Sequence, residues 1–166
     1  MSAPTVYLTN AATVRAAARG SERSKRCVGP GEVWCIMVRP RHHYGEGGDG
    51  LVPALVPRVE DLDAIRLGVI DFGEYRRRYV VGVVADLSPG ALMAQLWADP
   101  RDLGPVQDGA TLICACSQTE AAAGRCHRVF AADLLATAGW RVVLDGTRWD
   151  EAVSAERRRR AREGGA

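Results

Sequence analysis

The sequence has no apolar run near the ~20 residues that a membrane-spanning helix needs, and no large excess of charge of either sign. Its start, MSAPTVYLTN, lacks the basic residues and the apolar stretch of a signal peptide. We therefore expect no membrane partner and a cytoplasmic location. The net charge of +2 is by itself too small to indicate a nucleic-acid partner.

Lysine occurs only once, as Lys25, so nearly all of the 22 basic residues are arginine. Arginine suits phosphate and carboxylate partners, although a GC-rich genome produces the same excess together with abundant alanine, glycine and valine. Cysteine occurs five times, an odd number without the spacing of a disulfide framework. Structural disulfides are rare in a reducing cytoplasm, so we expect free thiols.

The order of the expected elements predicts the fold class. Apolar runs of strand length cover residues 5–8, 32–38, 110–116 and 140–146, and helix-forming stretches cover 11–20, 59–87, 88–97, 125–138 and 149–162. The stretch YVVGVV within 59–87 could instead be a strand, and residues 21–31 and 39–57 are expected to be loops. Strands alternating with helices predict a single α/β domain over residues 1–150, with a three-layer, mostly parallel, Rossmann-like sheet flanked by helices. Residues 151–166 would form a C-terminal arginine-rich helix or tail.

A cluster of cysteine and histidine lies in the segment TLICACSQTEAAAGRCHRVFAADLL, which leads from an expected strand into an expected helix. Ligands of α/β sheets gather at such junctions. Cys126 would open the helix between Arg125 and Arg128, where free N–H groups and cations lower the pKa of a cysteine. This pattern favours a catalytic thiolate at Cys126, with His127 as acid or base and Cys114 as a second reactive thiol. The same N–H groups and arginines would bind an anion.

Zinc binding by Cys114, Cys116, Cys126 and His127 is an alternative. In an extended strand Cys114 and Cys116 would stand roughly 6.6 Å apart, whereas two thiolates on one zinc ion approach to roughly 3.8 Å. The strand would therefore have to end between them. Cys126 and His127 are adjacent at a helix start and point about 100° apart, so both could be ligands only with an irregular first turn. On this interpretation the cofactor is zinc, and on the catalytic one there is none.

Two further interpretations stay open. Cys126, Phe130 and Leu134 fall on one stripe of the expected helix, so Cys126 could simply extend the hydrophobic core. The arginine clusters within 76–78 and 157–162 could instead mark an accessory protein that binds nucleic acid. Solvated helix surfaces explain both clusters as well.

The cysteine-rich segment also carries a family resemblance. LICACSQTEAAAGRCHRVFAADLL has an apolar strand, a polar loop and Cys-His-Arg at the opening of a helix, and it resembles the C-terminal signature of the family catalogued as domain of unknown function 488. IMVRPR (Ile36–Arg41), GGDGLVPALVPR and FGEYRRRYV are similar to other segments of that family, so the likeness extends over residues 5–146. Met37 stands where the family usually has aspartate, and Cys116 where it often has glutamate.

The resemblance implies a small cytoplasmic α/β domain of bacterial or phage origin, without an established reaction. It places in one pocket the side chains of Cys114, Cys126, His127, Arg128 and Arg39. We therefore expect an enzyme, a cysteine-dependent transferase or hydrolase, that acts on a small anionic or nucleotide-like ligand. The expected site residues are Cys126, His127 and Cys114 for catalysis and Arg128, Arg125, Arg39 and Asn10 for ligand binding.

Overall fold

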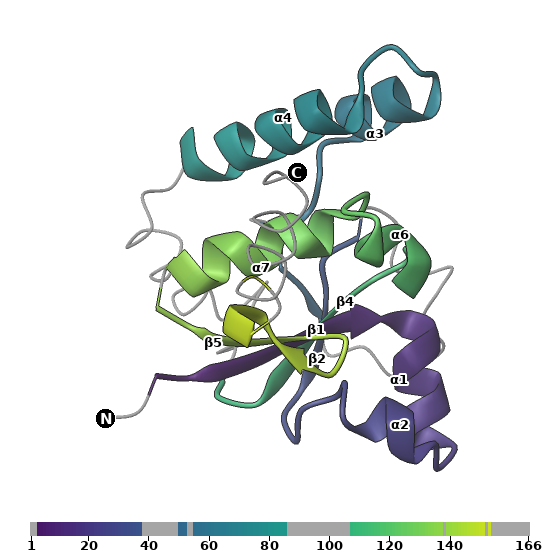
Figure 1. Cartoon of the computed structure of the whole chain (residues 1–166), viewed down its shortest axis with the longest axis vertical. Coiled ribbons are helices and arrows are strands. Elements are labelled where there is room, and N and C mark those ends of the chain that lie inside the picture. The colour runs from purple at the N-terminus through teal and green to yellow at the C-terminus, as the bar shows by residue number, and fades with distance from the viewer. Residues whose placement is uncertain are drawn as a thin grey trace, which may run out of the picture.

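The fold is built on a six-stranded sheet with helices on both of its faces (Figure 1). This computed structural model describes residues 3–37, 50–52, 55–85, 107–137, 139–151 and 153. In these residues the strands are β1 (Thr5–Asn10), β2 (Val33–Cys35), β3 (Gly50–Leu51), β4 (Ala110–Cys114), β5 (Arg141–Leu144) and β6 (Thr147–Arg148). The helices are α1 (Ala11–Ala18), α2 (Glu22–Lys25), α3 (Val59–Arg66), α4 (Phe72–Ala85), α6 (Gln118–Ala122) and α7 (His127–Thr137). None of the described helices is long and apolar enough to cross a membrane.

The sheet has the order β3-β2-β4-β1-β5-β6, and all of its described strands except β6 run parallel. β1 lies between β4 and β5, and β6 pairs antiparallel with β5. Parallel neighbours need a crossover connection, which helices usually supply. The predicted α/β class, with a mostly parallel sheet flanked by helices, is confirmed.

Alternate side chains of β4 enter two cores on opposite faces of the sheet. Leu112 and Cys114 join the larger core, which contains Phe130 of α7. Ile113, which lies between them, belongs to a smaller core that contains Ala11 of α1. Every residue of β4 is buried, as expected for a strand covered on both sides. α7 and α1 therefore cover opposite faces, and α4 packs on the outside of α7 (Figure 1).

Several element boundaries differ from the predicted ones for local reasons. The expected strand 110–116 ends at Cys114. The polar stretch after it forms α6 instead of a loop, because Ser117 and Glu120 make a reciprocal capping box. The expected loop 21–31 likewise contains the short helix α2. The stretch YVVGVV belongs to α4, so its alternative interpretation as a strand is wrong.

The prediction of a surface loop over residues 39–57 is wrong in the part that the structure describes. Residues 50–51 form β3 beside β2. Val52 and Leu55 have no exposed surface, because they complete the larger core. The expected helix 88–97 and most of the expected tail 151–166 lie outside the described residues.

Replacing Gly29 by alanine is expected to destabilise the fold. The added Cβ would lie 1.9 Å from the carbonyl oxygen of Gly109 and 2.5 Å from the ring of Tyr7, so the segment before β2 would have to move. We expect the free energy of unfolding, measured in urea, to fall by about 2 kcal/mol. Gly82→Ala is the matched control: its Cβ would make ordinary contacts with Arg58 at 3.5 Å, and alanine favours the helical backbone of α4. A Gly29→Ala protein as stable as the wild type would contradict this close approach.

Candidate functional site

Polar and thiol side chains gather where β1 and β4 end. Asn10 and Cys114, the last residues of these two strands, are partners in the parallel register. In the sheet order β2 lies on one side of this pair of strands and β5 on the other, and α1 and α7 leave it on opposite faces. The chain therefore diverges at this point. Ligands of open α/β sheets bind in the crevice that such a divergence creates.

Three thiols meet where these two strands end. Because β4 ends at Cys114, the backbone turns before Cys116, and the two thiols are not held apart along a strand. The sulfurs of Cys114, Cys116 and Cys126 all lie within 4.8 Å of one another. Cys114 Sγ and Cys126 Sγ are 3.4 Å apart. Cys114 and Cys126 are buried, whereas Cys116 is partly exposed and is the member of the cluster that solvent reaches.

The guanidinium group of Arg128 lies beside the three thiols and is fully buried. Its Nη1 donates hydrogen bonds to Cys114 Sγ at 3.1 Å, to Cys126 Sγ at 3.7 Å and to the carbonyl oxygen of Cys116 at 2.9 Å. Its Nη2 donates to the carbonyl oxygen of Ser117 at 3.2 Å. One side chain of α7 therefore holds the end of β4 and the segment that leads into α6.

Asp145, in the turn between β5 and β6, compensates the charge of Arg128. Its Oδ2 accepts from Arg128 Nη2 at 2.8 Å, and its Oδ1 accepts from Thr9 Oγ1 at 2.9 Å. Asp145 and Gly146 have φ angles of 48° and 84°, the left-handed values of a two-residue hairpin turn in which Asp-Gly is favoured. Sequence reasoning placed this stretch in a strand and missed the role of Asp145, although the Asp-Gly pair was an available signal.

The three thiols of the cluster differ in pKa. Hydrogen bonds from Cys116 and Cys126, with a further contribution from the Arg128 charge, hold the pKa of Cys114 well below its usual range. The hydrogen bond to Cys114 raises the pKa of Cys116 to about 12 and also raises the pKa of Cys126. Cys114 is therefore the thiol of the cluster that ionises most readily. The expected lowering of the pKa of Cys126 is wrong, because its hydrogen is shared with a neighbouring sulfur.

His127 and Arg125 lie close in sequence to the thiols, but their polar groups have other partners. His127 is buried, and its Nε2 donates to the carbonyl oxygen of Ile36 at 2.6 Å. Burial lowers the pKa of His127, so the ring is neutral and ties the start of α7 to the end of β2. Arg125 is exposed, and its guanidinium lies 5.3 Å from the centroid of the Phe72 ring on α4.

The other residues expected at the site are engaged elsewhere or lie outside the described residues. Asn10 is buried, and its Oδ1 accepts from the backbone N–H of Thr13 at 2.8 Å, which caps α1. Arg39 is outside the described residues. Residues 76–78, one of the two arginine clusters considered for nucleic-acid binding, form salt bridges with carboxylates on α3, α4 and α7. The other cluster, within 157–162, is outside the described residues.

Two tyrosines of α4 belong to the site although sequence reasoning did not include them. Tyr79 donates to the carbonyl oxygen of Leu55 at 2.8 Å, and its ring centroid lies 5.9 Å from that of His127. Tyr75 Oη is buried without a hydrogen-bond partner among the described residues. Burial raises the pKa of Tyr75, and negative charge on Cys116 raises it further, so the hydroxyl stays protonated. The spacing of the two tyrosines, one helical turn apart, indicates only that they share one face of the helix.

Among the described residues the three thiols are the group that could hold a metal ion. A tetrahedral zinc ion separates its sulfur ligands by roughly 3.8 Å, and the sulfurs lie within 4.8 Å of one another before any metal is added. The strand ends between Cys114 and Cys116, as a metal site requires. The Nε2 of His127 is hydrogen-bonded to the carbonyl oxygen of Ile36, so this nitrogen is not placed to be the fourth ligand.

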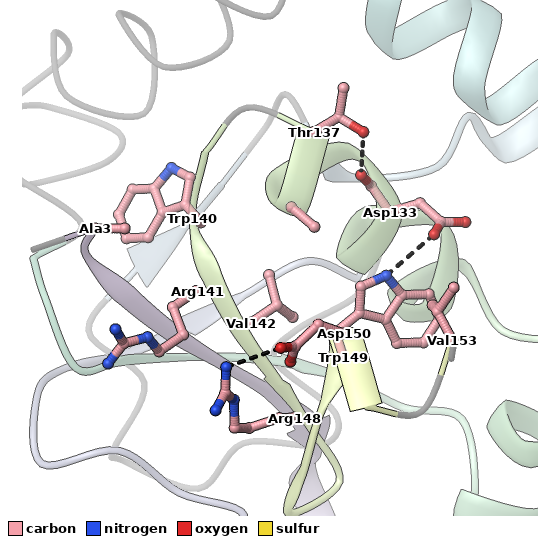
Figure 2. A pocket seen from close by; sticks show the side chains of 11 residues that line it. Ala3, Asp133, Thr137, Trp140, Arg141, Val142, Arg148, Trp149, Asp150 and Val153 are labelled. Atoms are coloured by element: carbon pink, nitrogen blue, oxygen red, sulfur yellow. Dashed lines mark hydrogen bonds and ion pairs between the residues drawn. The ribbon is translucent and has the colours of Figure 1, made fainter. Parts of the chain in front are cut away.

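A hollow of about 580 Å³ lies apart from this cluster, beside β5, β6 and the end of α7 (Figure 2). Trp140 and Trp149 line it, together with the charged side chains of Asp133, Arg141, Arg148 and Asp150. Arg148 forms a salt bridge with Asp150 at 2.8 Å, and Trp149 Nε1 donates to Asp133 at 3.1 Å. None of the thiols lines this hollow, so it is not part of the candidate site.

Comparison with known proteins does not identify a family. No protein-family model, no curated protein and no solved structure matches this chain. The resemblance to the domain of unknown function 488 therefore stays a prediction, and the function has to be argued from the site itself.

Replacing Arg128 by methionine should destabilise the protein far more than the same change at Arg125. Arg128→Met leaves Asp145, whose side chain is only 19% exposed, without its cation. We expect the free energy of unfolding in urea to fall by about 3 kcal/mol. Arg125→Met, at the exposed arginine of the same segment, should change it by less than about 0.5 kcal/mol. Similar losses in both variants would show that the guanidinium of Arg128 does not hold the site together.

Proposed function

We propose that this chain is a small cysteine-dependent enzyme of the cytoplasm, of the domain-of-unknown-function-488 type, in which Cys114 is the nucleophile. It acts without a cofactor on a small anionic or nucleotide-like ligand, by group transfer or hydrolysis. The observation that carries this proposal is the 3.1 Å contact between the fully buried Arg128 guanidinium and the Cys114 sulfur. A cation beside a cysteine stabilises the thiolate, which is the reactive form.

The choice of Cys114 over Cys126 rests on where the hydrogen bonds point. Cys114 Sγ accepts from Arg128 at 3.1 Å, which is shorter than the 3.7 Å contact of the same nitrogen with Cys126. Cys114 is also the last residue of a buried central strand, so the sheet fixes its position. Sites on rigid elements hold reacting groups more accurately than sites on loops.

Two buried donors support an anionic ligand. Three buried side-chain donors have no hydrogen-bond partner among the described residues, namely Trp34 Nε1, Arg128 Nε and Tyr75 Oη, and the last two belong to the candidate site. A buried donor without a partner costs about 1–3 kcal/mol, so a ligand oxygen that accepted these hydrogen bonds would remove the penalty. An anion would also be attracted by the charge of Arg128, and charge-assisted hydrogen bonds are the stronger kind.

In this proposal His127 and Asp145 are positioning residues. His127 fixes the start of α7 through its hydrogen bond to Ile36, and it does not supply the proton that the sequence suggested. Asp145 holds the Nη2 of Arg128 and so directs Nη1 toward the thiols. The partly exposed Cys116 marks the side from which the ligand enters.

The order in which iodoacetamide labels the thiols tests the proposal. Exposure favours Cys116, whereas ionisation favours Cys114, so the first thiol labelled at neutral pH shows which effect dominates. Trypsin releases both in one peptide, residues 102–125, in which tandem mass spectrometry separates the two sites. We expect Cys114 to react first, and at least about tenfold faster than Cys35, whose pKa burial raises to about 11. Labelling of Cys116 before Cys114 would refute the assignment of the nucleophile.

Protection by anions tests the ligand. Inorganic phosphate or adenosine monophosphate, at millimolar concentration, should slow the labelling of Cys114 in the wild-type protein. Tyr75→Phe removes one of the unpartnered donors of the site and should weaken this protection, whereas Tyr7→Phe on β1 is the matched control and should not. If neither anion protects Cys114, the anionic ligand is refuted.

A structural zinc module is a second candidate function, favoured by the fact that the three sulfurs lie within 4.8 Å of one another. Cys114, Cys116 and Cys126 would be the ligands, and His127 would not. Protein purified without a chelator should then contain one zinc ion per chain by inductively coupled plasma emission. Cys116→Ser should lose the metal, and Cys27→Ser, at a cysteine outside the cluster, should keep it. Metal-free wild-type protein would remove this candidate.

A further inference from the structure

One sulfur–sulfur contact within the thiol cluster joins cysteines from two different parts of the fold. Cys114 ends β4 and Cys126 directly precedes α7, and their sulfurs are 3.4 Å apart. A disulfide bond measures about 2.05 Å, so the sulfurs would have to approach by roughly 1.4 Å to form one. Arg128 Nη1 donates to both sulfurs and keeps them on the same side of its guanidinium group. The two thiols are therefore already adjacent in the reduced protein.

Burial restricts which oxidants can reach this pair. Cys114 has no exposed surface and Cys126 has 1%. Cys116 is the partly exposed thiol of the cluster, so a reagent approaches from its side. Burial therefore hinders the approach of a bulky disulfide to the Cys114 sulfur more than that of a small reagent. Hydrogen peroxide and short alkyl hydroperoxides are compact and uncharged, and they are the oxidants that such a buried thiolate can meet.

We propose that Cys114 and Cys126 form a redox pair that reduces a small hydroperoxide, in which Cys114 is oxidised first and Cys126 then closes the disulfide. This inference rests on the thiolate that the proposed function assigns to Cys114. It adds a substrate class and a second reacting thiol, neither of which group transfer or hydrolysis requires.

The reaction balances in two steps. The Cys114 thiolate attacks the terminal oxygen of the hydroperoxide, an S–O bond forms, and the O–O bond breaks. The leaving alkoxide or hydroxide takes a proton from water, so the sulfur loses two electrons and the hydroperoxide becomes an alcohol or water. The Cys126 sulfur, losing its proton, then attacks the sulfenic sulfur, an S–S bond forms, and the departing hydroxide combines with that proton as water. Two thiols and one hydroperoxide thus give one disulfide, one alcohol and one water.

Cys126 is assigned as the second thiol because of its distance and its burial. Its sulfur is 3.4 Å from that of Cys114 in the reduced protein. Being buried, it is held at this position and is not free to react with other molecules in solution. Cys116 belongs to the same cluster, but it is the partly exposed member and lies on the approach side.

Disulfide mapping tests the proposal on the wild-type protein. The reduced protein, in buffer with a chelator, receives one equivalent of hydrogen peroxide and is then denatured in N-ethylmaleimide and digested with trypsin. Cys126 is released in the tripeptide 126–128, and Cys114 in peptide 102–125. We expect these two peptides to be cross-linked. Cys27 and Cys35, which are buried outside the cluster, should both carry maleimide and serve as the internal control.

Two variants identify which thiol is oxidised first and which thiol closes the disulfide. Cys116→Ser should still form the cross-link, which assigns it to Cys114 within the longer peptide. Cys116→Ser combined with Cys126→Ser leaves no second thiol in the cluster, so dimedone should trap a sulfenic acid at Cys114. Far-UV circular dichroism checks that both variants are folded, and the wild-type map stands without them.

Several outcomes would overturn the inference. They are an intact dithiol after peroxide treatment of the wild type, a disulfide confined to peptide 102–125, and a cross-link that disappears in folded Cys116→Ser. These outcomes are distinct from a failure of the proposed function. The proposed function is tested on the reduced protein, by the order in which iodoacetamide labels the thiols and by the protection that anions give. A protein that labels Cys114 first but forms no cross-link retains the enzyme proposal and loses the redox pair. A protein that forms the cross-link but shows no anion protection retains the redox pair.

Discussion

One buried cation determines how the carboxyl edge of the sheet is organised. An unpaired charge inside a protein is costly, so the fully buried Arg128 requires acceptors from every segment around it. Two backbone carbonyls after β4, the carboxylate of Asp145 and the sulfur of Cys114 meet this requirement. The same requirement decides where negative charge resides among the thiols. On the proposed function, structure and reactivity at this site have a common cause, because Cys114 is both an acceptor of Arg128 and the proposed nucleophile.

The topology of the sheet explains why these groups lie together. β4 and β1 end side by side, and their helices leave on opposite faces. α6 forms part of the short connection between Cys114 and Cys126. After this one helix the chain is back at the carboxyl end of β4. Two cysteines that are twelve residues apart thereby come into contact. The hollow near Trp140 and Trp149 has no comparable arrangement of reactive groups.

The sequence was sufficient for the fold class and for the junction at which the three thiols meet. β1 and β4 are apolar runs of strand length, and each is followed by a helix, so alternation alone indicated a parallel sheet. The Cys-His-Arg segment follows a strand that ends at the carboxyl edge, and it therefore marked the right junction. The existence of α6 could also have been predicted, because Ser117 and Glu120 have the spacing of a capping box.

The roles of individual residues could not be predicted in the same way. Proximity to a helix start suggested a thiolate at Cys126, but the direction of its hydrogen bond depends on Cys114, which belongs to another element. His127 has the same position in the sequence whether it faces the thiols or the carbonyl of Ile36, and only packing decides between them. Tyr75 belongs to α4, far from the cysteines along the chain, so no local pattern could assign it to the site.

Position 145 shows how narrowly the hairpin constrains the choice of amino acid. The backbone there has φ 48°, which residues other than glycine, asparagine and aspartate adopt with difficulty. The guanidinium behind it needs an anion 2.8 Å away. Glycine and asparagine satisfy the first demand but bring no charge, and glutamate brings the charge on a backbone that tolerates the turn less well. Aspartate alone meets both demands. In homologues that carry another residue at position 145, we therefore expect a substitution of the arginine at position 128 as well.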